Sequence, residues 1–156
     1  MISQRMKMKL INWWPPMLGT GISLRYIDEK LLKFVVKLKL TWYNRNLVGI
    51  HYGGSLYSMC DPWYMFILMA NLGKGYVVMD KSANIRYLLP GRGTLKCIFE
   101  LTEERIQEIK TELDTIGKKD YTFLCEIKNA EGEVVTEVDK IVYVRKKDFD
   151  WEKFNK

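Results

Sequence analysis

Two glycines and one acid stand out in the segment 49–73, which reads GIHYGGSLYSMCDPWYMFILMANLG. Gly53 and Gly54 open a long apolar run, and Asp61, followed directly by Pro62, is the only acidic residue in the segment. An ionised carboxylate in an apolar segment is costly unless it is paired or takes part in a reaction. This segment is therefore where the sequence most directly suggests chemistry.

A helix that begins at the two glycines would present unpaired backbone N–H groups and a partial positive charge at its start. Gly53 and Gly54 would let a ligand approach this backbone without a side chain in the way. Such a turn can polarise a carbonyl group and stabilise an oxyanion, an effect of about 3–4 kcal/mol per donor. Asp61, two helical turns further along, could then activate a water molecule or attack the carbonyl itself.

Each of these residues also has a structural interpretation. Asp61 could pair with Arg45 or another basic group, and the glycines could only ease packing at a helix start. Asn46 could bond its own backbone within a loop. His51, the single histidine, could be an ordinary, partly exposed loop residue.

The apolar run from residue 55 to 72 is too long for one buried strand and favours a helix. It is apolar nearly all round, so a sheet or a subunit partner should wrap it. Gly73 and Gly75 should end the helix, and Pro62 should kink it beside the acid.

The N-terminal segment, residues 1–16, is predicted to contain a helix that ends at Pro15-Pro16. One side of it is apolar, and basic residues lie between the apolar ones: Arg5, Met6, Lys7, Lys9, Leu10, Trp13 and Trp14. It could pack over the edge of its own sheet or a partner subunit, or lie as a weak peripheral contact on an anionic membrane surface.

The remaining sequence favours strands and one further helix. Residues 21–44 contain two strands, the second with a buried period-two face formed by Phe34, Val36, Leu38, Leu40 and Trp42. A strand ending at Pro90-Gly91 is predicted to pair with residues 94–101. Residues 102–117 form a surface helix capped by Thr102, and residues 121–145 a hairpin that turns at 129–132.

This order predicts an α+β domain in which one antiparallel sheet covers one apolar helix. With 156 residues, 47% of them hydrophobic and 28% charged, the chain is expected to form a single domain with a charged tail at 148–156. A formal charge of +6 favours anionic partners such as phosphates, but it is too mild to indicate nucleic acid, which we do not expect.

The three cysteines are far apart and form no CxxC pair, which excludes the usual zinc and disulfide patterns. They predict reduced, structural thiols in the cytoplasm. The N-terminus lacks a cleavage site typical of a signal peptide, and residues 63–70 are too few to cross a membrane, so we expect no transmembrane segment.

Asn46, Gly49, Gly53-Gly54 and Asp61, followed by Leu88-Leu89-Pro90 and the Gly93 turn, resemble the hotdog-fold acyl-CoA thioesterases, most closely the phenylacetyl-CoA thioesterase-like branch. The stretches NRNLVGIHYGGSLYSMCDPWYM and DKSANIRYLLPGRGTL more specifically resemble a bacterial hotdog family of unknown function. The resemblance runs from about residue 15 to 145. It implies an antiparallel sheet wrapped around one long central helix, with a small inserted surface helix, in a homodimer or homotetramer.

The resemblance further implies hydrolysis of an acyl-CoA thioester without a metal, with coenzyme A as part of the substrate. Gly53 and Gly54 would polarise the thioester carbonyl, and Asp61, supplied by one subunit to the glycine turn of the other, would act as base or nucleophile. Asn46 with His51 or Tyr52 would position the substrate.

Two departures from the family pattern are visible. Tyr52 stands where the family has a histidine before the two glycines, and Asp80, with Ser82 two residues on, stands where a Ser or Thr often assists.

The resemblance also places basic residues near the coenzyme A groove, where they could meet its phosphates: Arg86, Arg92 and Lys96. Solvated charges on strand faces and turns are the alternative interpretation. An alternative function on the same scaffold is a non-catalytic acyl-CoA or fatty-acyl binding protein. A hydratase-type hotdog enzyme fits less well because the lone histidine is not placed for it.

Overall fold

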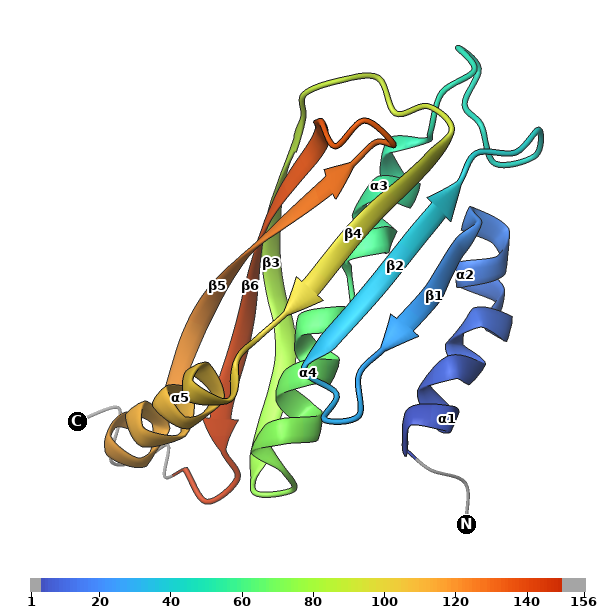
Figure 1. The fold of residues 1–156 in the computed structure, drawn as a ribbon. Helices are drawn as coiled ribbons and strands as arrows, with labels where there is room; N and C mark the ends of the chain where they lie inside the picture. The colour runs from blue at the N-terminus through green and yellow to red at the C-terminus, as the bar shows by residue number, and fades with distance from the viewer. Residues whose placement is uncertain (1–3, 150–156) are drawn as a thin grey trace.

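The computed structural model describes residues 4–149, which form a six-stranded antiparallel sheet with helices on one face and at its ends (Figure 1). The strand order is β1-β2-β4-β5-β6-β3, so β1 and β3 are the two edges. The strands are β1 (Ile22–Ile27), β2 (Lys33–Lys39), β3 (Tyr76–Tyr87), β4 (Thr94–Glu100), β5 (Lys118–Lys128) and β6 (Val134–Lys146). The expected α+β class and the order of elements are confirmed.

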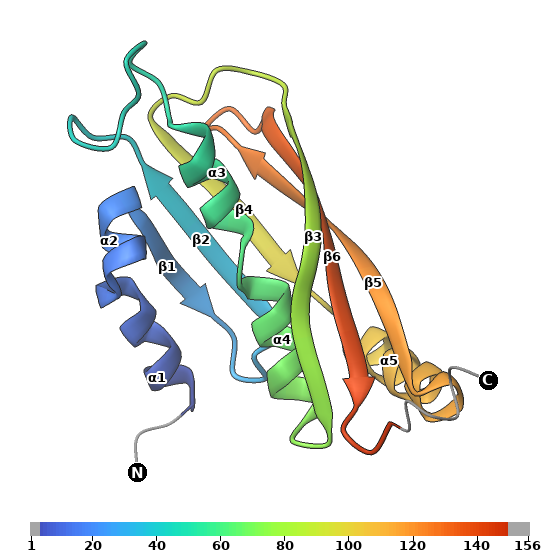
Figure 2. The ribbon, with the colours of Figure 1, turned by 180° about the vertical axis from the view of Figure 1, so that it is seen from behind.

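The central apolar segment lies against the inner face of the sheet (Figures 1 and 2). It consists of two helices, α3 (Gly53–Cys60) and α4 (Trp63–Leu72), so the kink predicted at Pro62 is a full break in the helix. The break falls at Asp61 and Pro62, because the proline has no backbone N–H to continue the helix. The Trp63 indole Nε1 donates a hydrogen bond of 2.7 Å to the Met59 carbonyl and so occupies one acceptor freed by the break.

The pairing predicted between β3 and β4 is wrong. β3 pairs along its length with β6, from Tyr76 opposite Lys146 to Tyr87 opposite Thr136. β4 lies between β2 and β5 instead. The connection between β3 and β4 crosses the end of the sheet, where it is held against the chain before α3 by His51, so it does not form a hairpin turn.

The alternating pattern of β2 is confirmed for Phe34, Val36 and Leu38, which are fully buried, but it stops at Lys39. The Asn44 side chain turns the chain there, since its Oδ1 accepts from the Thr41 N–H and its Nδ2 donates to the Lys39 carbonyl. Leu40 and Trp42 therefore lie outside the strand, and Trp42 is 82% exposed instead of buried.

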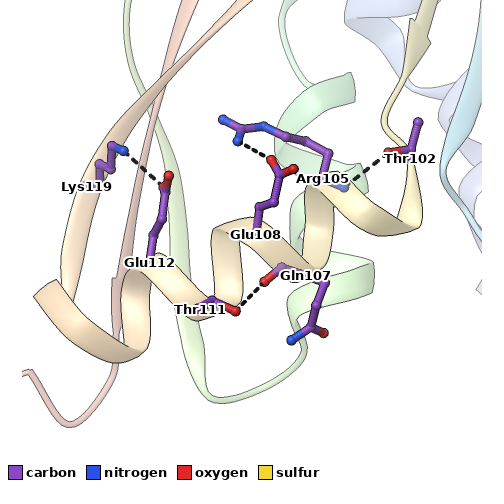
Figure 3. A network of polar contacts seen from close by, with 7 residues as sticks. All are labelled: Thr102, Arg105, Gln107, Glu108, Thr111, Glu112 and Lys119. Atoms are coloured by element: carbon purple, nitrogen blue, oxygen red, sulfur yellow. Dashed lines mark hydrogen bonds and ion pairs between the residues drawn. The ribbon is translucent and has the colours of Figure 1, made fainter.

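The predicted surface helix is α5 (Glu103–Ile116), which lies beside the ends of β5 and β6 (Figure 1). Its N-cap is Thr102, whose Oγ1 accepts from the Arg105 N–H at 3.1 Å. Ion pairs along its exposed side join Arg105 to Glu108 and Glu112 to Lys119 of β5 (Figure 3). The predicted β5–β6 hairpin and its turn are also confirmed.

The N-terminal segment is helical beyond the predicted end: α1 (Gln4–Lys9), the 3-10 turn η1 (Leu10–Trp13) and α2 (Pro15–Thr20). The proline pair does not end the helical segment but begins α2, where a missing N–H costs nothing. The segment covers the β1 edge, because the Asn12 side chain bonds both the N–H and the carbonyl of Leu24. Most of the predicted charged tail, residues 150–156, lies outside the described residues.

Candidate functional site

Asp61 lies at the break between α3 and α4, with its side chain 51% exposed. Its Oδ1 accepts a hydrogen bond of 2.9 Å from the Lys140 ammonium group. The Asp61 carboxylate is therefore not buried within the apolar run, because the helix break turns it towards solvent. The alternative that Asp61 pairs with a basic group is confirmed, but the partner is Lys140 of β6 and not Arg45.

Lys140 is the buried centre of this site, with a side chain only 1% exposed. It pairs with two carboxylates, Asp61 and, at 3.2 Å, Asp80 Oδ2, and its Nζ lies 5.3 Å from the centre of the Tyr57 ring. Burial by itself lowers the pKa of Lys140, but the hydrogen bond that Lys140 donates to Asp61 and the charges of both acids outweigh burial and raise the pKa overall. Lys140 is thus held charged inside the protein.

Asp80 sits at a β-bulge in β3, where the register against β6 shifts between Asp80 and Ser82. Its Oδ2 faces Lys140, while its Oδ1 is buried without a hydrogen-bond partner among the described residues. Burial raises the pKa of Asp80 by more than Lys140 lowers it, and the nearby charge of Asp61 adds to the rise. Asp80 is the carboxyl group of the pair that takes a proton more readily than an ordinary aspartate.

Three cysteines that are distant in sequence meet in the core behind this cluster. Cys60, Cys97 and Cys125 are free and buried. The contact with Cys125 lowers the pKa of Cys60, but Cys97 and burial outweigh it and hold that pKa well above the usual value. The Cys60 thiol is therefore protonated and unreactive, as expected for a structural cysteine.

The glycine pair forms the first turn of α3, and two tyrosine rings lie against it. A Cβ atom at Gly53 would stand 2.8 Å from the Tyr87 Oη, and one at Gly54 would stand 2.4 Å from the Tyr52 ring. Tyr52 is the N-cap residue of α3 but makes no capping bond with its side chain, which is exposed. Glycine therefore leaves room for these two tyrosine side chains, and this packing explains the pair whether or not a ligand binds.

Within one chain the glycine turn and the acid do not meet. They lie at opposite ends of α3, an eight-residue helix that rises by about 12 Å. A single thioester carbonyl cannot reach Gly53 and Asp61 of the same chain at once.

His51 and Asn46 are both engaged with the backbone. The buried His51 donates its N–H to the Gly91 carbonyl and its Nε2–H to the Gly93 carbonyl, each at 3.0 Å. Asn46 Oδ1 accepts from the N–H groups of Val48 and Ile50, which is the loop-capping role that the sequence left open. Neither side chain is directed by these contacts to a ligand.

The three basic residues predicted to meet coenzyme A do not gather in one place. Arg86 is bound on β3 by Glu137 and Asp139 of β6. Lys96 lies on the outer face of β4, in a groove of about 490 Å³ that contains Lys37 and Lys128 as well, across the sheet from Asp61. Arg92 alone lies beside the start of α3, in the loop that His51 holds.

Lys140 was missed in the sequence, although a signal for it exists. It stands in phase with the buried residues Val138, Val142 and Val144 on the inner face of β6. A lysine at an inward position of an alternating strand needs a buried anionic partner. The pattern does not say which acid is that partner.

The fold is similar to solved structures over almost the whole chain. A protein of unknown function from Pseudomonas aeruginosa, described as a probable thioesterase, matches with a TM-score of 0.81 at 18% identity, over 93% of this chain and 97% of that one. A thioesterase from Haemophilus influenzae matches with a TM-score of 0.66 at 11% identity, over 97% and 96%. The fold is therefore the hotdog fold of thioesterase-like proteins.

Residues 3–144 match the family model described as Domain of unknown function (DUF4442), and the chain belongs to this family. Among curated proteins no sequence match is found. No helix within residues 4–149 is long and apolar enough to cross a membrane.

Proposed function

We propose that this protein hydrolyses an acyl-CoA thioester, with Asp61 as general base or nucleophile and the Gly53-Gly54 turn as the group that polarises the thioester carbonyl. The observation that carries the proposal is the environment of Asp61. Its carboxylate is half exposed at a helix break and is held at 2.9 Å by the ammonium group of the buried Lys140. A base or nucleophile has to be oriented and accessible, and Asp61 meets both conditions.

The proposed site is shared by two subunits. The length of α3 separates Gly53 from Asp61 in one chain, so the glycine turn of one protomer would work with Asp61 of its partner. The free edge of β3, which is 12 residues long, supports such a homodimer, because an unpaired edge can continue the sheet into a second copy. Pairs of such dimers would make the tetramer.

Coenzyme A enters this proposal as part of the substrate. Arg92 is the basic residue best placed to meet its phosphates, since it lies in the loop bound to His51 next to the start of α3. Arg86 would have to leave Glu137 and Asp139 to do so. The free, buried thiols support a location in the reducing cytoplasm.

The test is release of free thiol from acyl-CoA esters of varied chain length, compared between the parent and Asp61→Asn. We expect the substitution to lower the rate by about 100-fold or more, while stability falls little because Asp80 continues to pair with Lys140. The matched control is Asp120→Asn, which removes an exposed, lysine-paired aspartate elsewhere in the sheet and should leave the rate unchanged. Unchanged thiol release in Asp61→Asn would show that Asp61 is not the catalytic acid.

A non-catalytic acyl-CoA or fatty-acyl binding protein is the second candidate. It is favoured by His51, which is buried and whose Nε2–H is bound to the Gly93 carbonyl, so that this nitrogen is not available to orient a thioester as the family histidine does. Calorimetric binding of a CoA ester by the parent protein, with no thiol released from any ester tested, would establish this function and exclude hydrolysis.

A further inference from the structure

The N-terminal helical segment carries two sets of apolar residues, and only one set is buried. On the inner side Met8 and Ile11 pack on the core, and Met17 is buried. The outer side carries four large apolar residues that remain in solvent: Leu10, Trp13, Trp14 and Leu18. Trp13 is 76% exposed and Trp14 54%. Covering the β1 edge explains the inner side but not the outer one.

The loop after β2 extends this outer side with two more aromatic residues. Asn44 Nδ2 donates a hydrogen bond of 2.9 Å to the Thr20 carbonyl and so ties the loop to the last residue of α2. Trp42 and Tyr43 precede this anchor, are both exposed, and contact each other edge to face with their ring centroids 5.7 Å apart. We call the combined surface the aromatic face: Leu10, Trp13, Trp14, Leu18, Trp42 and Tyr43.

The segments that form the aromatic face carry charges of one sign. Residues 1–27 contain no Asp or Glu. Lys7 and Lys9 are exposed on α1, and Arg45 is exposed next to the loop anchor. Tryptophan and tyrosine rings favour the boundary between water and lipid, and basic residues beside them are attracted to anionic headgroups.

We propose that the aromatic face binds the surface of a membrane that contains anionic phospholipids. This goes beyond the proposed hydrolysis and does not depend on it. A second copy of the chain is the less suitable occupant, because two copies joined through this face would bring their lysines together without an acid among residues 1–27 to compensate them. An anionic membrane surface provides both the negative charge that would pair with the lysines and the lipid boundary that would cover the aromatic rings.

The test is flotation of the full chain with vesicles made of equal parts phosphatidylcholine and phosphatidylglycerol, against vesicles of phosphatidylcholine alone. We expect binding to the anionic vesicles that weakens as salt is added. Trp13→Ser with Trp14→Ser, and separately Lys7→Glu with Lys9→Glu, should each lower the partition coefficient by about tenfold or more. The charge control is Lys74→Glu with Lys147→Glu, which makes the same change in charge by the opposite edge of the sheet and should bind within about twofold of the parent.

Quenching by lipids brominated on the acyl chain gives a second measurement. Tryptophan fluorescence of the parent should be quenched on anionic vesicles, and quenching should fall in the Trp13→Ser, Trp14→Ser variant. The proposal is overturned if the parent does not float with anionic vesicles, or if both test variants bind as well as the charge control. It is also overturned if the face instead mediates self-association, seen as a mass that falls when both tryptophans are replaced.

Discussion

Lys140 holds the candidate site together, because it is the buried cation that pairs with both Asp61 and Asp80. Replacing it by methionine would leave Asp80 buried without a cation, whereas Asp61 could turn to solvent. We expect Lys140→Met to lower the free energy of unfolding by about 3 kcal/mol at pH 7, measured by denaturant titration. The matched control is Lys96→Met on the outer face of β4, which should change stability by less than about 0.5 kcal/mol.

A second substitution, at Asp80, tests whether the loss of stability in Lys140→Met comes from the unpaired charge. Adding Asp80→Asn to Lys140→Met removes the uncompensated carboxylate, so the double variant should recover most of the lost stability. A double variant that is less stable than Lys140→Met alone would show that the cost comes from packing and not from charge.

Because His51 is buried, we expect it to make the stability of the folded protein depend on pH, with a direction that follows from the shift in its pKa. Burial lowers its pKa below the usual 6.5, although the bond to Gly93 partly opposes the shift. The folded protein therefore binds a proton less readily than the unfolded chain does. His51 contributes stability that is complete above pH 6.5 and is lost as the pH falls through its lower folded pKa.

The single histidine makes this effect directly measurable. One imidazole signal should titrate by NMR with a midpoint below 6.5. His51→Gln should make the loss of stability between pH 6.5 and 5 smaller than in the parent. A midpoint at or above 6.5 would contradict the buried, neutral His51 described above.

At the scale of elements, the break between α3 and α4 depends on Trp63. Its indole satisfies the Met59 carbonyl, and its ring packs among Phe34, Phe66 and Phe99. Trp63→Phe keeps a ring but leaves that carbonyl without this donor, so we expect a loss of about 1–3 kcal/mol of unfolding free energy. Trp42→Phe, on an exposed tryptophan, should cost less than about 0.5 kcal/mol in the same titration. Equal losses in the two variants would rule out a role for the indole bond.

At the scale of the whole molecule, the proposal is that each active site is shared by two subunits. Mixing two inactive variants can test it. Asp61→Asn removes the acid, and Gly53→Val puts a side chain on the glycine turn, where it meets only the flexible end of Tyr87. When equal amounts are unfolded and refolded together, half of the dimers are hybrids with one intact site, so about a quarter of the parent activity should return. No return of activity despite hybrid dimers, identified by native mass spectrometry, would mean that the site is not shared.

Much of the fold could be predicted from the sequence, because local patterns carry it. Thr102 and the apolar stripe of α5, the alternation in β2 and the β5–β6 turn all express interactions between residues close in the chain. The neighbour of β3 could not be predicted in this way. Strand order depends on which distant edges are buried together, and nothing local in residues 76–100 distinguishes β6 from β4 as partner.

The candidate site, too, could be predicted only in part. The sequence by itself determined that Gly53, Gly54 and Asp61 belong to one apolar helical segment and that Pro62 interrupts it, because spacing along a chain determines position along a helix. Only the tertiary structure decided that Asp61 faces solvent, that Lys140 is its partner and that His51 holds the β3–β4 connection. Asp61 and Lys140 are 79 residues apart, and a charge pair at that separation arises only when the sheet folds over the helix and excludes water from the lysine.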